Sequence, residues 1–543
     1  NTDGSTAHTS ALLDVKSTTK GVLVPRMSKT EKNAIASPAT GLMVFQNAPD
    51  SVGFYYYDGS SWLWMATANA TVGWLTTGNS GTDSAVNFLG TLDDKPLMLR
   101  QNNLWMGQLN TKTHNYFIGA GSGFNNTSQN NTALGDSALF TNITGNTNVA
   151  IGANALTRYT GSNTVAIGYK ALDSLTTGIV NTAVGYRAMA QTTTGQRNTA
   201  LGYRSLDSNK TGNYNTAAGY ASMYRNTSSF GTGIGDFALG SNTTGEANTV
   251  VGSNSFPVST TGEWNTVMGT NTMFYNTTGS YNTALGFQSL YNNRSGQLNT
   301  AVGLRALYRN DSGHHNIAVG YNSLYNHRRN GSSYNVAMGN FSLESDTSGY
   351  YNVGIGTSAL RSNINSAGNT AVGTNALYNH KYNDLNTAVG YESMIADTAG
   401  FYNTAMGWRS LRYNLAGNQN TAIGVGALES TDSATGNTAI GRGAMIGTIG
   451  NTTDLGYNTV VGFYAGALMD SVSNSTAIGT QAGYNNRGNE NTFLGLNSGF
   501  GASGTNLTGI ENTGLGTATL AYTNTGRANT AVGLGALYAN RTG

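Results

Sequence analysis

The chain has 543 residues, 73 of them glycine, only 5 proline and none cysteine, and charged residues make up 10%. This composition excludes collagen, coiled coils, charge-rich disordered chains and disulfide-stapled domains. No run of 18 apolar residues is present to span a bilayer, and a net charge of +2 gives no basic footprint for nucleic acid.

The first part of the chain, up to about residue 114, does not repeat and contains four of the five prolines. The expected elements are, in chain order, strands at 12–15 and 22–24, a short helix at 28–36, a strand at 42–45, a hairpin of 54–57 and 62–64, and a second β-rich stretch from Trp74 to Trp105. Ser28 and Glu31 form a capping box that starts the helix. We therefore expect a β-rich cap or base domain over 1–70 and a β-rich connector over 71–114.

A single motif fills the rest, which we interpret as a rod over 115–543. The motif is Asn-Thr-Ala-aliphatic-Gly-x-x-(Ala/Ser)-(Leu/Met), and it occurs 25 times between Gly119 and Gly533, with a mean step of 17.25 residues. We number each repeat from its glycine. Position −1 is aliphatic in 24 copies, position −4 is Asn in 22, and position +4 is Leu, Met or Phe in 21 and Gly in the other four.

A 17-residue period is too short for a propeller blade or a helix pair and fits one coil of a parallel β-solenoid, with two short strands and two turns. Alternation places Thr199 and Leu201 on one side of a strand and Ala200 on the other. Because the Thr column exchanges with Val and Ile, we expect it to be at least half-buried, and we expect Val302→Asp to put a charge in the coil interior. An all-β rod of about 25 flattened coils, roughly 115 Å long, follows.

Stacking explains the scarcity of charge, because like charges ~4.8 Å apart repel by ~0.9 kcal/mol even in water. The Asn column is predicted either to form a ladder between coils or to mark a tight turn into the strand. The longest intervals carry their extra residues at one edge, at 327–331, 448–455 and 502–508. That edge is expected to be the variable outer one.

The motif Asn-Thr-Ala-Val-Gly-x-x-Ala-Leu resembles the head repeat of trimeric autotransporter adhesins, although those heads favour a shorter period. The resemblance implies a left-handed parallel β-roll assembled as a trimer. The N-terminal pieces, among them Lys20 to Met27 and Pro38 to Leu42, resemble the start of secreted Bacteroidota-type fibre proteins. This resemblance implies an extracellular or cell-surface protein exported after removal of a signal peptide.

No catalytic set, metal site or cofactor site is predicted. His327 and His380 occupy equivalent positions three coils apart, too far for one metal, and His314-His315 reads as a solvated turn. Gly-x-Gly sequences arise from the repeat and lack the helix that phosphate binding needs. Arg328, Arg329 and Lys381 could form a basic spot on the variable edge, with a solvated turn as the alternative.

Aromatic columns are the main functional indication. The candidate ligand or interface residues are Tyr169, Tyr186, Tyr203, Tyr220, Tyr291, Tyr308 and Tyr325. They suit binding of glycans along a groove or, alternatively, packing between protomers or across coils.

The sequence therefore predicts a non-enzymatic extracellular fibre or adhesin, a rigid homo-oligomeric rod that attaches to a glycan or protein on another cell. Three protomers are favoured over other cyclic numbers, and no nucleic-acid partner is expected. The alternatives are a phage-tail-like receptor-binding fibre and a glycan-degrading solenoid, the latter disfavoured because 26 acids are scattered along the chain. Ice binding is a minor alternative, discounted because the Thr column behaves as a buried one.

Overall fold

The computed structural model describes residues 6, 8–47, 51–65, 88–447, 455–501 and 507–542. The chain divides into two compact units, Asn1–Asp93 and Asp94–Gly543. The expected start of the second β-rich stretch at Trp74, and most of the insertions at 448–455 and 502–508, lie outside the described residues.

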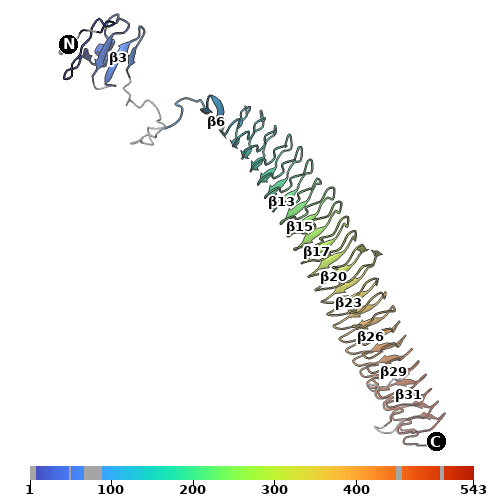
Figure 1. Ribbon diagram of the computed structural model, residues 1–543. Helices are drawn as coiled ribbons and strands as arrows, with labels where there is room; N and C mark the ends of the chain where they lie inside the picture. Colours follow the sequence, from blue (N-terminus) through green and yellow to red (C-terminus); the bar gives the residue numbers. More distant parts are fainter. Residues whose placement is uncertain are drawn as a thin grey trace. The chain divides into compact units, whose positions relative to one another are not determined.

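The N-terminal unit holds a four-stranded sheet and one short helix (Figure 1). Its elements are β1 (Arg26–Met27), α1 (Lys29–Asn33), β2 (Met43–Gln46), β3 (Gly53–Tyr57) and β4 (Trp62–Trp64). The predicted capping box is confirmed: the Ser28 hydroxyl accepts from the Glu31 backbone N–H, and the Glu31 carboxylate accepts from the Ser28 backbone N–H at 2.8 Å. The predicted hairpin is also confirmed, as antiparallel β3 and β4.

Two predicted strands of this unit are wrong. Residues 12–15 and 22–24 form no strand, and their large apolar side chains stay in solvent, with Leu12 fully exposed and Leu23 79% exposed. A strand needs a neighbour to accept its ladder hydrogen bonds, and β1, which does pair with β2, begins only at Arg26. The apolar composition of these segments was therefore not sufficient to make them strands.

The second unit is a parallel β-solenoid in which successive coils stack along a rod (Figure 1). It begins with an antiparallel hairpin of β5 (Leu97–Gln101) and β6 (Leu104–Asn110), and β6 pairs antiparallel with the first coil strand, β7. From β7 onward each strand pairs in parallel with the next, and in the described residues β5 and β33 share no pairing, so the ladder is linear and open-ended. The predicted β-solenoid of about 25 coils is confirmed.

Each coil contributes one short strand to this ladder, in register with its neighbours. The 25 strands are β7 (Asn115–Ile118), β8 (Thr132–Leu134), β9 (Val149–Ile151), β10 (Val165–Ile167), β11 (Thr182–Val184), β12 (Thr199–Leu201), β13 (Thr216–Ala218), β14 (Thr232–Ile234), β15 (Thr249–Val251), β16 (Thr266–Met268), β17 (Thr283–Leu285), β18 (Thr300–Val302), β20 (Ile317–Val319), β22 (Val336–Met338), β23 (Val353–Ile355), β24 (Thr370–Val372), β25 (Thr387–Val389), β26 (Thr404–Met406), β27 (Thr421–Ile423), β28 (Thr438–Ile440), β29 (Thr459–Val461), β30 (Thr476–Ile478), β31 (Thr492–Leu494), β32 (Thr513–Leu515) and β33 (Thr530–Val532).

The second strand expected in every coil is not formed. After the glycine the backbone alternates into the left-handed region at positions +2 and +4, for example at Arg305 (φ 56°) and Leu307 (φ 51°). A chain that leaves the β region at every second residue cannot sustain a ladder. The far side of the coil is therefore built from turns, whose backbone groups still bond to the next coil, as when Leu307 N–H donates to Ser323 O at 3.0 Å.

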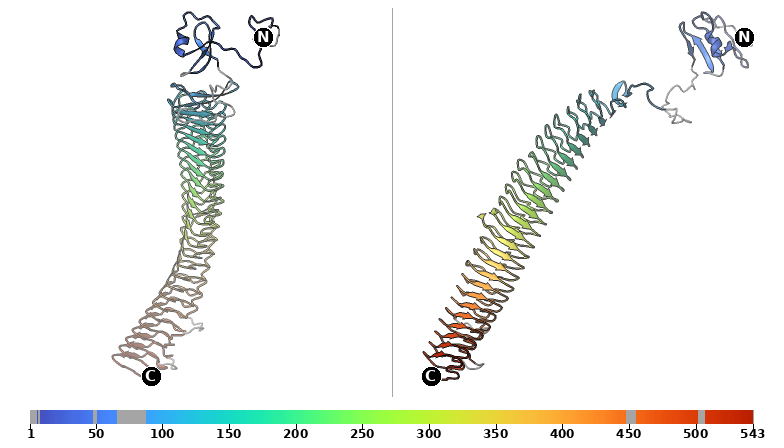
Figure 2. Two further views of the ribbon diagram at one scale, coloured as in Figure 1. Left: turned by 90° about the vertical axis from the view of Figure 1, so that its left-hand side faces the viewer. Right: turned by 180° about the vertical axis from the view of Figure 1, so that it is seen from behind.

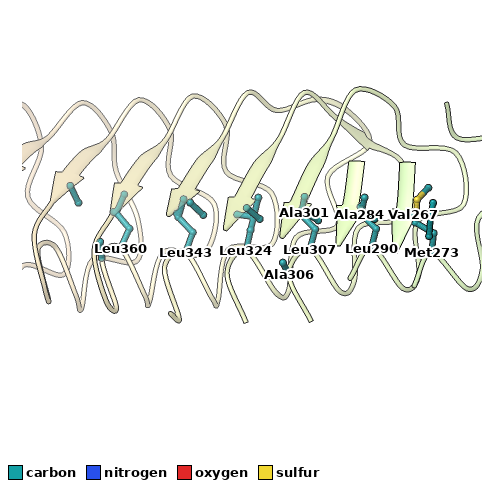
Figure 3. Close-up of a cluster of buried hydrophobic side chains, with 14 of the residues drawn as sticks. Val267, Met273, Ala284, Leu290, Ala301, Ala306, Leu307, Leu324, Leu343 and Leu360 are labelled. Carbon is teal, nitrogen blue, oxygen red and sulfur yellow. The ribbon is translucent and has the colours of Figure 1, made fainter. Parts of the chain in front are cut away.

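The core is a single apolar column inside the rod, and both the strand side and the turn side of each coil contribute side chains to it. Alanines at position −2 of the strands, such as Ala301, face leucines at position +4 of the turns, such as Leu307, and both are fully buried (Figure 3). Alanine suits the strand side because the interior of a 17-residue coil is thin. The coil therefore buries its small strand residue and one larger turn residue.

Two of the four repeats with Gly at position +4 follow from the same packing. Gly499 has φ 61°, close to the leucines of this column, and a Cβ on it would lie 2.5 Å from the ring of Phe493, the residue at position −2. Gly123 has the same relationship to Phe117. In these two coils a phenylalanine on the strand side replaces alanine, and the turn side has glycine in place of leucine. The coils of Gly466 and Gly483 have the smaller Val460 and Ala477 at position −2.

The invariant glycine of the motif is required by the close approach of successive coils. Gly303 has φ 129°, and a Cβ there would lie 2.7 Å from the carbonyl oxygen of Gly320 in the next coil. Any side chain at this position would therefore collide with the backbone of the following turn.

The Asn column at position −4 forms a ladder, one of the two arrangements that the sequence left open. The backbone N–H of Asn198 donates to Oδ1 of Asn181 in the preceding coil at 3.0 Å, and Nδ2 of Asn198 donates to the carbonyl of Gly212 at 2.9 Å. The pattern recurs along the rod, and these side chains are buried. Amides can fill this column because each presents donors and an acceptor without adding charge.

Candidate functional site: the outer surfaces of the rod

The strand face of the rod is the largest candidate interaction surface, and its orientation corrects one expectation. Thr300 and Val302 at positions −3 and −1 point outward and are half-buried, whereas Ala301 between them is fully buried. The interior position assigned to Val302 is therefore wrong. The alternation itself was right, but a period of two does not say which side faces inward.

Position −1 forms an apolar column along this outer face. Its side chains are half-buried or exposed in the described residues, for example Leu201 at 54% and Met268 at 50%. The other members above one-third exposure are Ile118, Leu134, Ile234, Met338, Ile355, Met406, Ile423, Ile440, Ile478, Leu494, Leu515 and Val532. A contiguous apolar stripe of this length marks an interaction surface, because soluble monomers rarely leave one uncovered.

The Thr column runs beside the apolar stripe on the same face. None of these residues is fully buried, and Thr199, Thr216 and Thr249 are exposed. The argument that discounted ice binding, a buried Thr column, therefore does not hold. Exchange of Thr with Val and Ile reflects an outer face that is partly apolar.

The seven candidate tyrosines divide into two separate stacks. Tyr169, Tyr186, Tyr203 and Tyr220, at position +1, stack face to face over four successive coils, with ring centroids 5.4, 5.1 and 5.0 Å apart. Their exposures of 42–48% leave one side of the stack open to solvent. Whether they bind a ligand or a second protomer stays a prediction.

The other three candidates lie at position +5, at the far edge of the coil. Tyr291, Tyr308 and Tyr325 stack with centroids 5.1 and 5.0 Å apart and near-parallel rings. Phe274 extends this stack by one coil, 5.5 Å from Tyr291. The four tyrosines at position +1 therefore form one stack and the three at position +5 form another, and the two stacks lie at different positions around the coil.

Most ion pairs on the rod join residues in neighbouring coils, and Arg204–Asp207 lies within one coil. Arg361 Nε lies 2.7 Å from Glu344 Oε2, and Arg412 Nη2 lies 2.8 Å from Glu392 Oε2. Burial disfavours ionisation of Glu392, but a hydrogen bond with Tyr391 and the guanidiniums of Arg412 and Arg409 outweigh it, so the pKa of Glu392 is lowered. Charged residues are therefore tolerated in the stacked coils where acidic and basic side chains lie next to each other.

The three residues of the predicted basic spot are not equivalent. Arg328 is exposed at position +8, whereas the Arg329 guanidinium lies 4.3 Å from the Tyr350 ring centroid and donates to Ser348 O at 3.2 Å. Lys381 is exposed three coils further along, also at position +8. Arg328 and Lys381 are therefore both exposed on this edge, three coils apart, and Arg329 is held against Tyr350.

Both equivalently placed histidines are buried and paired with an aspartate, which sequence reasoning missed. His327 Nδ1 lies 2.6 Å from Asp346 Oδ2, and His380 Nδ1 lies 2.9 Å from Asp397 Oδ1. All four residues occupy position +7, and the two members of each pair lie in successive coils, so aligning the repeats at that position would have revealed the pairs.

The adjacent histidines at the edge behave differently from this buried pair. His314 and His315 stay half-buried at the edge, and burial together with the neighbouring His315 lowers the pKa of His314. Within the described ranges, no group of three or more His, Asp or Glu side chains is arranged to hold a metal ion. Nor does any described helix have the length and apolarity to cross a bilayer.

Comparison with known proteins adds one match. Residues 1–82 match a family model described as "Phage tail like trimerisation region". No curated protein matches the chain. The trimerisation match and the solenoid rod together describe a structural fibre that assembles as a homo-oligomer, with three copies favoured.

Proposed function

We propose that this chain is the shaft of a trimeric extracellular fibre that attaches to other cells or surfaces. The observation that carries the proposal is the apolar column at position −1, which stays partly exposed on the single chain along the whole ladder. Three rods side by side would bury this stripe about a common axis. The trimerisation match at residues 1–82, in the N-terminal part of the chain, supports the same stoichiometry.

Exposed apolar residues in the N-terminal unit fit the same assembly. Val22, Leu23 and Val24 line an open apolar pocket of about 240 Å³ with Phe45 and Phe54. Packing of two further copies against this surface would bury side chains that a lone unit leaves in water. Trimerisation would then begin in this unit and continue along the rod.

The stoichiometry can be tested by mass and by crosslinking. A trimer of 56.7-kDa chains is expected in sedimentation or native mass spectrometry. Because the chain has no cysteine, Leu201→Cys introduces a single thiol in the apolar column, and a short bismaleimide should link it between chains. Thr194→Cys, exposed on the turn side, is the matched control and should link poorly. A monodisperse monomer, or equal crosslinking of both variants, would contradict the proposal.

The location and use of the fibre form the second part of the proposal. We place it outside the cell, as an adhesin of the kind that the repeat resembles. The match to a phage-tail-like region favours a second candidate, the receptor-binding fibre of a tail-like particle. Gold-labelled antibodies against the rod distinguish them, because label along cell envelopes supports the adhesin, whereas label on released tail-like particles supports the receptor-binding fibre.

A further inference from the structure

An open cleft lies on the turn-side edge of the rod and spans three successive coils. Its volume is about 460 Å³, and it is lined by Asn292, Arg294, Tyr308, Arg309, Asp311 and Arg328. These residues occupy positions +5, +6 and +8 of their repeats. The cleft is therefore separate in the coil from the apolar column at position −1, and trimer packing through that column leaves it available.

The edge of the rod is reinforced at this place. The coil that contains Arg328 is longer than the usual 17 residues, and part of its insertion forms β21 (Gly331–Ser332), which pairs in parallel with β19 (Gly313–His314). This two-stranded sheet lies at mid-rod (Figure 2). The backbone N–H of Arg328 also donates to Thr347 O at 2.9 Å. The insertion thus holds Arg328 on an ordered support.

The cleft concentrates positive charge that is only partly neutralised. It holds three guanidiniums and one carboxylate, and Arg294 Nε lies 3.6 Å from Asp311 Oδ1. Among the described residues, Arg309 and Arg328 have no carboxylate within 4.0 Å. Since stacked coils disfavour neighbouring like charges, an unneutralised cluster in a chain with only 10% charged residues points to an anionic ligand.

An aromatic wall stands beside the guanidiniums. Tyr308 lines the cleft and is the middle ring of the stack formed with Tyr291 and Tyr325. The guanidinium of Arg309 lies 5.6 Å from the ring centroid of Tyr325, which orients it along the wall. Because Tyr291 and Tyr325 cover both faces of the Tyr308 ring, Tyr308 offers its ring edge and its hydroxyl to a ligand, and a phenol hydroxyl can hydrogen-bond the hydroxyl groups of a sugar. Guanidiniums pair with carboxylate or sulfate groups through two parallel hydrogen bonds.

We infer that this cleft binds an acidic polysaccharide, a glycan chain that carries carboxylate or sulfate groups. Arg309 and Arg328 pair with the anionic groups, and the Tyr308 hydroxyl hydrogen-bonds a sugar between them. Arg294 and Arg328 stand two coils apart, roughly 10 Å, so an extended chain can meet both. The inference names a ligand class for the attachment proposed above, and it depends on the trimer only for avidity between three equivalent clefts.

Binding of the full chain to immobilised polysaccharides tests the inference. The probes are polygalacturonate for carboxylate, dextran sulfate for sulfate, and uncharged dextran and single-stranded DNA as controls. The double variant Arg309→Gln, Arg328→Gln removes both unpaired guanidiniums. The double variant Arg158→Gln, Arg225→Gln is the matched control. Both residues are exposed at position +6 of other coils, and replacing them removes the same total charge.

We expect at least one acidic polysaccharide to bind, more weakly as salt rises, and the cleft variant to lose about tenfold or more in affinity. The control variant should stay within about twofold of the wild type. Equal losses in the two variants, equal binding of uncharged dextran, tighter binding of DNA, or no binding of either acidic chain would each overturn the inference. The native mass of the same samples separates this inference from the trimer proposal. A monomer that binds acidic polysaccharide contradicts only the trimer proposal, and a trimer that does not bind contradicts only this inference.

Discussion

The Nδ1 atom of His380 lies 2.9 Å from Oδ1 of Asp397 in the next coil, with both side chains fully buried. His380 Nε2 also faces the carbonyl oxygen of Asn383 at 3.0 Å, and Asp397 accepts from the Gly400 backbone N–H and from Asn414 Nδ2. The pair therefore replaces two amides of the position +7 column with a hydrogen-bonded acid and imidazole.

His380→Leu should destabilise these coils by about 3–5 kcal/mol, because it leaves the Asp397 carboxylate buried without its partner. The double variant His380→Asn, Asp397→Asn restores the amides found elsewhere in the column and should stay within about 1 kcal/mol of the wild type. Hydrogen exchange of amides in the coils of β24 to β26 measures local opening directly. Equal loss of protection in the single and double variants would show that the pair is not coupled.

The inward and outward positions of β18 can be separated by one charge. Ala301→Asp should cost several kcal/mol and unfold the surrounding coils, because it buries a carboxylate without a partner. Val302→Asp should leave the β-sheet signal in circular dichroism intact while it weakens assembly, because its side chain points outward. Sedimentation combined with circular dichroism distinguishes these results. Unfolding of both variants to the same extent would contradict the orientation of the strand.

The exchange between Phe493 and Gly499 predicts a compensating pair of mutations. Gly499→Leu alone should cost about 1–3 kcal/mol by overpacking against the ring, and Phe493→Ala alone about 3–5 kcal/mol through the cavity it leaves. Together they recreate the Ala301 and Leu307 arrangement and should cost less than about 1.5 kcal/mol. Thermal unfolding of all three variants measures the coupling. Additive losses would show that the two sites do not share one space.

Glu392 predicts an acid-sensitive contribution to stability. Its pKa is lowered in the folded chain, so its ion pairs with Arg409 and Arg412 stabilise the rod above the ordinary value of 4.5 and are lost as the pH falls through the lowered value. Glu392→Gln should therefore lower stability at pH 7 by about 1 kcal/mol or less, since the arginines are partly exposed.

The difference between wild type and Glu392→Gln should shrink below about pH 4.5, as both side chains become uncharged. Urea unfolding followed at pH 7 and at pH 3 measures it. Glu511→Gln, whose partner Arg527 is largely exposed, serves as the comparison and should show a smaller effect at pH 7. A difference that grows on acidification would contradict the assignment.

The repeat carried enough information to predict the solenoid and the number of coils, because both depend on residues that recur at a fixed position, whereas it left a ladder and a tight turn open for the Asn column. It did not decide which face of a strand is inside, since Thr199 and Leu201 alternate with Ala200 in either orientation. The small alanine occupies the interior because the coil is narrow, a constraint on volume rather than hydrophobicity.

The surface features needed the stacked coordinates. Arg328 could be identified from sequence as a basic residue on the variable edge. Arg294 lies 34 positions earlier, and stacking of the coils places it two coil steps away on the same edge. The strands predicted at 12–15 and 22–24 failed for the opposite reason, because their local pattern lacked a neighbouring strand. Local sequence pattern thus indicated which segments could form strands, and the presence of a neighbouring strand decided whether each segment did so.

The uniform register of the ladder has a consequence for how such a gene can change. β12 pairs with β13 through the same three positions that β11 uses to pair with β12. Removal of residues 199–215 would join Asn198 to Thr216 and leave every remaining strand with an equivalent neighbour. Loss or duplication of such a segment during replication would alter the reach of the molecule by one strand spacing, about 4.8 Å, while its cross-section stays the same.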